Sequence, residues 1–459
     1  MQAVSQKMET PEKGSFWLPN AFFFALIHLG ALLGGIYLSP PSTLCKQTII
    51  LTILCWQLPC FGQVYFFRGV GNIETNALPS STGRLYSITI GYHRLWSHKA
   101  FRAVKPVRFV LAIFGTMAFQ GSIKWWVLRH RLHHRFTDDP VHDPYVVWFA
   151  FVVNLDVCLT LSNASYAATR GLFFSHMGWI FRKPTYTKLP LIEKDDLDRD
   201  PIVRFQHKYY VPLALFTGLV LPTMIAATWG DAMGGYIWGG LVGRVLVWHC
   251  TFLVNSLAHW EGLQPYTDEI TARGNLIMAM LTCGEGNHNF HAFPHDFRAG
   301  PNILDWDPSK WIITMLYRLG LATGLRKAHP EDIKAAQAWI LSHHHEPFPA
   351  SANDEAETDS AESTDEVVLA KWSLNELNKQ AKQRGCLLVI DGFVVDASSY
   401  VGDHPGGSVF LRRYAVPKEG ARTSEEWRKA TWAFQGGMNV HSRIAKRRMM
   451  SMRVAELME

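Results

Sequence analysis

Histidine is the residue whose number and spacing in this sequence indicate chemistry. The 459 residues include 20 histidines, and many of them cluster in the short motifs HRLWSH, HRLHH and HNFH. Neutral imidazole is the commonest nitrogen ligand of iron, copper and zinc in proteins. The motif histidines, with one more that follows the last long apolar segment, are His93, His98, His130, His133, His134, His259, His288 and His291. This set is larger than the three or four ligands of a zinc site and contains no cysteine, so the pattern indicates two metal ions.

The spacing within the motifs predicts how the side chains point. On a helix, His130, His133 and His134 project from one face, because they are three and four residues apart. His93 and His98 are five residues apart, which places them roughly 140° apart around a regular helix. We therefore expect these two to serve different metals. Histidines outside the motifs, such as His28, His207 and His249, are interpreted singly as surface residues or as core residues with satisfied hydrogen bonds.

The elements that must position the histidines are apolar enough to cross a membrane. Charged residues make up 18% of the chain and apolar residues 48%, whereas about a quarter of a soluble protein is charged. A bilayer core needs roughly 20 apolar residues per helix. The longest apolar stretches are residues 21–38, 48–61, 109–119, 211–227 and 235–254. The first, fourth and fifth approach full spans, and residues 48–61 with 87–92 are interpreted as one more span with an insertion.

Charge and cysteine usage restrict the compartment and the partners. The loops at residues 39–47 and 230–234 carry one lysine between them, whereas residues 94–207 and 261–326 are rich in lysine and arginine. By the positive-inside bias, both termini are expected in the cytosol, and the first span is expected to stay as an anchor, since residues 1–16 lack a signal-peptide pattern. The net charge of +6 and the absence of a dense basic block exclude nucleic acid as a partner. Seven cysteines without paired spacing favour a reducing compartment.

The chain is predicted to contain two folded domains. Residues 346–366 hold eight acidic residues and no lysine or arginine, a composition that cannot bury a core. We predict a mainly α-helical, polytopic membrane domain at 1–340, with four spanning helices and a cytosolic cap. A linker at 341–366 leads to a small α+β domain at 367–459, where short apolar strands alternate with Gly/Pro turns.

The histidine motifs and their flanks resemble those of membrane acyl-CoA desaturases, most nearly the fungal delta-9 (stearoyl-CoA-type) enzymes. The flanks are GYHRLWSHKAF, AFQGSIKWW, GLFFSHMGWIF, FLVNSLAHW and GEGNHNFH, and the resemblance covers about residues 19–326. It implies a di-iron centre on the eight histidines, with Asn255 holding a metal-bound water. It also implies acyl-CoA contacts at Asn20 and Phe252. Lys183, with Arg182, would meet the CoA phosphates or would serve only as positive-inside residues.

The sequence departs from the family pattern in three places. The third motif usually reads HNxHH, but here Ala292 follows His291 and the distance to the next Phe-Pro is one residue shorter. One of nine expected ligands is therefore absent, and His295, four residues on and after a proline, is a disfavoured substitute. Arg129 stands where animal enzymes carry an aspartate that helps to bind CoA. Residues 63–86 and 146–166 are insertions, one or both of which we interpret as retained introns or gene-model errors.

The C-terminal domain carries a second histidine signal. His404 lies in the motif DHPGG, and His441 follows 37 residues later in MNVHS. This pair resembles the axial haem ligands of cytochrome b5, over about residues 369–454. A bis-histidine haem has no open coordination position, so it passes electrons and does not bind oxygen.

Taken together, the resemblances imply an O2-dependent desaturase that places a cis double bond at carbon 9 of stearoyl- or palmitoyl-CoA. Two electrons would come from NADH through a separate cytochrome b5 reductase and the fused haem. The implied location is the endoplasmic reticulum membrane, with membrane lipid as a further partner. The alternatives are a different bond position or hydroxylation on the same scaffold, and a catalytically inactive haem-binding membrane protein.

Overall fold

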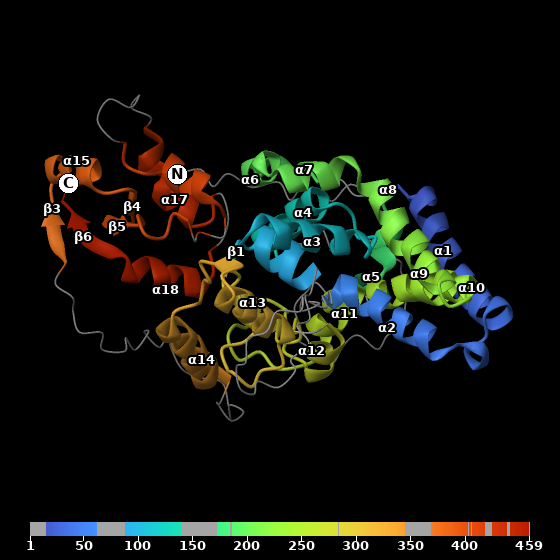
Figure 1. Cartoon of the computed structure of the whole chain (residues 1–459). Coiled ribbons are helices and arrows are strands. Elements are labelled where there is room, and N and C mark those ends of the chain that lie inside the picture. The colour runs from blue at the N-terminus through green and yellow to red at the C-terminus, as the bar shows by residue number, and fades with distance from the viewer. Residues whose placement is uncertain are drawn as a thin grey trace, which may run out of the picture. The chain divides into compact units, whose positions relative to one another are not determined.

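The computed structural model describes most of the chain as two compact units (Figure 1). The described residues are 15–61, 88–138, 143, 172–183, 186–282, 284–344, 369–402, 404, 406–417, 425–437 and 441–458. The first unit comprises Met1–Gln264 and Ile270–Lys327, and the second comprises Pro265–Glu269 and Ala328–Glu459. The insertions at 63–86 and 146–166 and linker residues 345–366 lie outside the described residues.

The first unit is almost entirely helical. Its main elements are α1 (Leu18–Leu33), η1 (Gly34–Leu38), α2 (Lys46–Phe61), η3 (Ile88–Ser97), α3 (Lys105–Thr116), α4 (Ile123–Arg135), α5 (Leu172–His176), η5 (Gly178–Phe181), α6 (Asp195–Arg199), α7 (Pro201–Lys208), α8 (Tyr210–Leu215), η7 (Phe216–Val220), α9 (Leu221–Ala227), α10 (Ala232–Gly234), η8 (Gly235–Val242), α11 (Gly243–Trp260), α12 (Leu276–Thr282), η9 (His288–Ala292) and α13 (Pro308–Arg318). The short strands β1 (Arg102–Ala103) and β2 (Ala322–Thr323) pair antiparallel.

Three continuous helical stretches are long and apolar enough to cross a membrane. They are Leu18–Leu38, Tyr210–Ala227 and Ala232–Trp260, and they coincide with the three predicted near-full spans. The first stretch exposes large apolar side chains such as Phe22, at 70%, which suits a helix that faces lipid. The predicted fourth span corresponds to α2 and η3, which contact each other. The chain between these two elements, 62–87, lies outside the described residues, so the described part contains three candidate spans.

An apolar core formed by η3, α3, α4 and α13 supports the histidine motifs. Its fully buried members include Ile90, Leu111, Ile123, Leu132 and Ile313. Helix α4 begins at a defined N-cap, where the Ser122 hydroxyl accepts a hydrogen bond from the Trp125 N–H at 3.2 Å, an interaction that fixes the start of a helix. Packing of the apolar side of α4 in this core fixes the rotation of the helix about its axis. That rotation determines where His130, His133 and His134 point.

The second unit contains a four-stranded sheet with helices on both faces. The sheet order is β3-β6-β5-β4, with β3 (Ala370–Trp372), β4 (Leu387–Ile390), β5 (Phe393–Asp396) and β6 (Arg453–Leu457); the helical elements are α14 (Pro330–His344), α15 (Leu374–Gln383), α16 (Ser408–Arg413), η10 (Glu425–Lys429), α17 (Ala430–Phe434) and α18 (Arg443–Ser451). Side chains alternate between two cores, because Leu387 and Val394 join one while Leu388 and Val395 join the other, as the pleat of a strand requires. The prediction of a small α+β domain is confirmed.

Candidate metal centres and substrate cavity

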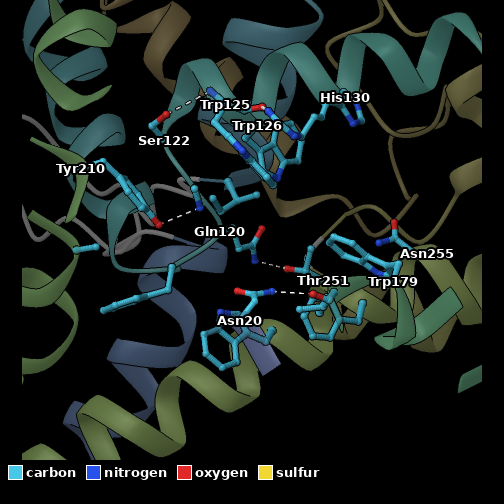
Figure 2. Close-up of a pocket in the computed structure, with 18 of the residues that line it drawn as sticks. Asn20, Gln120, Ser122, Trp125, Trp126, His130, Trp179, Tyr210, Thr251 and Asn255 are labelled. Atoms are coloured by element: carbon cyan, nitrogen blue, oxygen red, sulfur yellow. Dashed lines mark hydrogen bonds between the residues drawn. The ribbon is translucent and has the colours of Figure 1, made fainter. Parts of the chain in front are cut away.

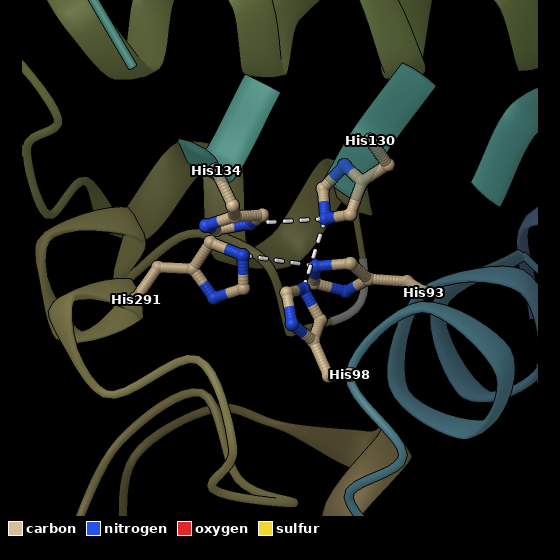
Figure 3. A group of neighbouring side chains, drawn as sticks. All are labelled: His93, His98, His130, His134 and His291. Atoms are coloured by element: carbon tan, nitrogen blue, oxygen red, sulfur yellow. Dashed lines mark hydrogen bonds between the residues drawn. The ribbon is translucent and has the colours of Figure 1, made fainter. Parts of the chain in front are cut away.

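Five histidines converge on one point in the first unit (Figure 3). We call His93, His98, His130, His134 and His291 the five-histidine group, whose ligand nitrogens all lie within 4.8 Å of one another. The Nε2 atoms of His93 and His291 are 3.1 Å apart, and the Nε2 atom of His130 lies 2.9 Å from that of His98 and 3.1 Å from that of His134. Five imidazole nitrogens that face the same small volume fit a transition-metal ion.

A wide helical turn brings His98 to the same point as His93. Element η3 is a π-helix, and the His98 N–H donates to the His93 carbonyl oxygen at 3.0 Å, which closes an i to i+5 turn. The two imidazole rings are consequently 4.7 Å apart. The expectation that these residues diverge toward different metals is wrong, because it assumed the angular period of a regular α-helix.

The other three predicted ligands gather beside this group. We call His133, His259 and His288 the three-histidine group. The rings of His259 and His288 are 5.1 Å apart. His259 and His133 both lie close enough to His288 to lower its pKa, in addition to the larger effect of burial. The face of α4 is therefore divided, since His130 and His134 belong to one group and His133 to the other.

Hydrogen bonds at Nδ1 orient two members of the three-histidine group. Both carboxylate oxygens of Asp143 lie 2.8 Å from His133 Nδ1. His259 Nδ1 donates to the Thr271 hydroxyl at 2.7 Å, and that hydroxyl donates to Asp138 at 2.9 Å. Metal-ligating histidines commonly make such a bond through the second ring nitrogen. Because Nδ1 of each ring is used in these contacts, Nε2 is the atom left to bind a metal.

Burial keeps most of these imidazoles in the form that binds metals. Among those outside the candidate spanning helices, burial is the largest effect on five and lowers their pKa well below 6.5: His98, His130, His134, His288 and His291. Neutral imidazole is the ligand form of histidine. His133 is the exception, because the Asp143 carboxylate outweighs burial and raises its pKa.

A buried ion network joins the first and third histidine motifs. Arg94, 3% exposed, donates to Glu285 at 3.1 Å and to Asp307 at 3.0 Å. The same Glu285 oxygen lies 3.2 Å from His93 Nδ1. Although burial alone would raise the pKa of Glu285, His93 and Arg94 hold it well below its usual value. The network fixes the ring of His93 and ties η3 to the loop that precedes η9.

Sequence reasoning did not identify Glu285 and Asp143 as parts of the site. Their signal would have been proximity, because Glu285 lies three residues before His288 and Asp143 lies ten residues after His133. Ala292 ends η9, and the five-histidine group does not include His295. The described ligand set is thus unequal, with five imidazoles in one group and three in the other.

One large cavity meets both histidine groups, and Figure 2 shows part of its lining, including His130 and Asn255. Its volume is about 810 Å³, within the range of small-molecule sites. His93, His130, His133 and His288 line it together with Asn255, and its walls are mainly aromatic, with Phe23, Phe24, Phe119, Trp125, Trp126, Trp179, Trp248 and Phe252. A polar pair crosses this apolar lining, where Gln120 donates to the Thr251 hydroxyl at 2.7 Å.

The predicted substrate residues divide between the cavity wall and the surface. Asn20, Arg182 and Phe252 line the cavity, and Asn20 Nδ2 donates to the Ile180 carbonyl at 2.8 Å. Lys183 is exposed and is not among the described lining residues; its N–H donates to the Ser15 carbonyl at 2.9 Å. Arg129, at the departure from the family pattern, lies in the wall.

Aromatic rings hold the Arg129 guanidinium. It stacks 3.8 Å from the centre of the Trp125 ring and 4.6 Å from that of Tyr186. Lys208 also lines the cavity, so three basic side chains, Arg129, Arg182 and Lys208, belong to the lining. These cations suit the phosphates of a CoA head.

The second unit brings His404 and His441 together. Their ring centres are 6.4 Å apart, close to the roughly 6 Å expected when two imidazoles bind one iron through bonds of about 2 Å. His404 Nδ1 donates to the Gly407 carbonyl at 3.0 Å, and His441 Nδ1 donates to the Phe434 carbonyl at 2.8 Å. Both contacts direct Nε2 toward the space between the rings, which fits axial ligation of a haem.

Known proteins share both parts of the chain. Residues 77–295 match the family described as fatty acid desaturase, and residues 373–416 match the cytochrome b5-like heme/steroid binding domain. Acyl-CoA desaturase 1 of Saccharomyces cerevisiae is 37% identical over 376 residues, which are 81% of this chain and 66% of that protein, just under two thirds of its length. A probable acyl-CoA desaturase of Schizosaccharomyces pombe is 35% identical, over 96% of this chain and 77% of that protein. Stearoyl-CoA desaturase 5 of Homo sapiens is 31% identical, over 70% of this chain and 83% of that protein. The chain belongs to the fatty acid desaturase family and carries a cytochrome b5-like domain at its C-terminal end.

Proposed function

We propose that this protein desaturates acyl-CoA at carbon 9, using O2 and electrons from its own haem domain. The observation that carries the proposal is the aromatic cavity of about 810 Å³ that reaches both histidine groups. In the balanced reaction, a saturated acyl chain, O2, two electrons and two protons give the cis-monoenoic chain and two waters. Stearoyl- and palmitoyl-CoA are the proposed substrates, and relatives are named acyl-CoA and stearoyl-CoA desaturases.

The chain's own residues would position the substrate. Arg129, Arg182 and Lys208 would bind the CoA phosphates, and the aromatic walls would hold the acyl chain away from water. Positioning of this kind is what selects one methylene pair among many identical ones. The two irons would supply the oxidant that an unactivated C–H bond requires and that no side chain can provide. His93, His98, His130, His133, His134, His259, His288 and His291 would hold them, with Asn255 binding a water.

The haem domain would deliver electrons one at a time. His404 and His441 would hold the haem, and a haem held by two histidines would transfer electrons and would not bind oxygen. A flexible tether raises the effective concentration of a donor to about the millimolar range. NADH-cytochrome b5 reductase is the proposed source of the electrons.

The proposed setting is the endoplasmic reticulum membrane. Three candidate spans are present among the described residues, and α2 with η3 would provide the fourth. An even number of spans places both termini on one side, and the bias of lysine and arginine assigns that side to the cytosol.

The ligand set also favours one alternative. Because Ala292 replaces a histidine of the family motif, the three-histidine group offers fewer nitrogens than the five-histidine group. A chain that could not fill both iron positions would be a haem-binding membrane protein without desaturase activity. Iron content separates the two possibilities, since the active enzyme needs about two irons per chain and the alternative would hold fewer.

A yeast strain that requires unsaturated fatty acid tests the function. We expect the full chain, or the chain without residues 63–86 and 146–166, to restore growth on medium without supplement, and His133→Ala to fail. Expressed, haem-loaded protein that supports no growth in either form would contradict desaturation. Monoenes with another bond position, or hydroxylated lipids, would favour a different outcome on the same scaffold.

A further inference from the structure

Three histidines outside the metal groups contact one another in the first unit, and two of them lie in candidate spanning helices. His28 lies in α1, His249 in α11 and His176 at the end of α5, and each is partly buried. From the sequence, His28 and His249 are each interpreted singly as a surface residue or as a core residue with satisfied hydrogen bonds. Ionisable side chains within spanning helices are costly and usually have a function, so their meeting requires an explanation.

The three rings form a linear chain of contacts. His249 Nε2 lies 3.2 Å from His28 Nε2, and His249 Nδ1 lies 2.8 Å from His176 Nε2. Because His249 presents a different nitrogen to each neighbour, the rings do not surround one point. This geometry is unsuited to a metal ion and suited to a hydrogen-bonded brace between helices. We call His28, His249 and His176 the imidazole chain.

Both ends of the imidazole chain reach the backbone of residues that form the cavity wall. At one end, His28 Nδ1 donates to the Phe24 carbonyl at 2.7 Å. At the other, His176 Nδ1 lies 3.0 Å from the Ser256 hydroxyl, which contacts the Phe252 carbonyl at 2.9 Å. The described lining of the cavity includes both phenylalanines but none of the three histidines. The imidazole chain therefore lies behind the wall.

Ring contacts complete the connection between the imidazole chain and the wall. The rings of Phe24 and Phe252, on separate helices, are 6.2 Å apart. The Phe252 ring lies 5.7 Å from that of His176 and 6.0 Å from that of His249, and the Phe24 ring lies 6.1 Å from that of His28. A shift in the imidazole chain would thus move both phenylalanines.

The number of protons available for hydrogen bonds shows that the three imidazoles and the Ser256 hydroxyl depend on one another. The array makes five contacts from the Phe24 carbonyl to the Phe252 carbonyl. Three neutral imidazoles and one hydroxyl carry only four protons for them. The ring tautomers must therefore be set jointly along the array, as in a cooperative network, and a substitution at the centre reaches both ends.

We propose that His28, His249 and His176 are positioning residues for the acyl chain, which act by fixing Phe24 against Phe252. This inference rests on the proposed function, because it concerns how the same cavity discriminates between acyl chains. The central residue, His249, is the most informative to change. Leucine is compatible with a spanning helix but cannot bridge His28 and His176. Glutamine can still donate to one and accept from the other.

The test compares His249→Leu with His249→Gln in the full-length holoenzyme, with His343→Gln on the exposed end of α14 as the matched control. The readouts are kcat/KM for palmitoyl-CoA and stearoyl-CoA and the position of the double bond. We expect His249→Leu to change the ratio of the two kcat/KM values by roughly threefold or more, a typical coupling between residues in contact, and to add products with a shifted bond. His249→Gln and the control should keep the wild-type ratio and bond position.

A double-mutant cycle guards against a merely structural effect. If the imidazole chain acts through the wall, the effects of His249→Leu and Phe252→Leu on the substrate ratio should be non-additive. Additive effects, or an unchanged ratio in folded His249→Leu, would overturn the inference. If His249→Leu does not accumulate in cells, His28→Leu and His28→Gln give the same comparison at one end of the imidazole chain. Inactive wild-type protein with full iron and haem would instead defeat the proposed function.

Discussion

Removing the Asp143 carboxylate should weaken one iron position and spare the other. Both oxygens of Asp143 contact His133 Nδ1 at 2.8 Å, and the residue is 3% exposed. In Asp143→Asn the negative charge is lost and an NH2 group, which is a donor, replaces one carboxylate oxygen. Only the amide oxygen then remains to accept from His133 Nδ1. Loss of such an outer-shell partner typically weakens metal binding about 10–100-fold. The five-histidine group does not include His133, so its metal position should be unaffected.

Iron binding by the purified full chain measures this effect directly. The chain is dialysed against a series of buffered ferrous concentrations, and bound iron per haem is determined. We expect a two-step curve in which the weaker step alone moves about 10–100-fold in Asp143→Asn. Asp195→Asn is the matched control, because that carboxylate is 66% exposed on α6. Equal movement of both steps, or of neither, would refute the assignment of His133 to a separate position.

Four further substitutions test other parts of the protein. His133→Ala should abolish desaturation while the haem absorption spectrum stays intact, and undiminished product formation would contradict the ligand assignment. His404→Ala or His441→Ala should each lose the haem spectrum and most activity, with part of the activity restored by separately added cytochrome b5; full activity without an added donor would exclude the electron-transfer role. Arg94→Leu leaves Glu285 and Asp307 buried without their cation, so we expect a loss of about 3–5 kcal/mol in stability, seen as a lower Tm; Arg199→Leu, in an exposed pair on α6, should leave the Tm unchanged.

The spans and the histidine motifs could be predicted because each has a local signal. Residues 21–38, 211–227 and 235–254 are long and predominantly apolar, and the structure contains helices that cover all three. His130, His133 and His134 face one side because a regular helix holds them. Length and periodicity are properties of short segments, so they can be read from a sequence directly.

The division of ligands between two groups could not be predicted in the same way. It depends on the π-turn at His93, where one extra residue changes the direction in which His98 points. Contacts such as His133 with Asp143, or His28 with His249, join residues 10 and 221 positions apart. These distances have no fixed period, so only the folded chain brings the partners together.

The most direct test of the proposed function is the position of the double bond in products from chains of different length. The full-length protein is supplied with NADH, cytochrome b5 reductase and either palmitoyl-CoA or stearoyl-CoA, and the products are analysed by gas chromatography with double-bond location. If Arg129, Arg182 and Lys208 fix the CoA end, distance is counted from the thioester, and both substrates should give the cis-9 monoene. A bond that moves with chain length, or a hydroxylated product, would contradict the account.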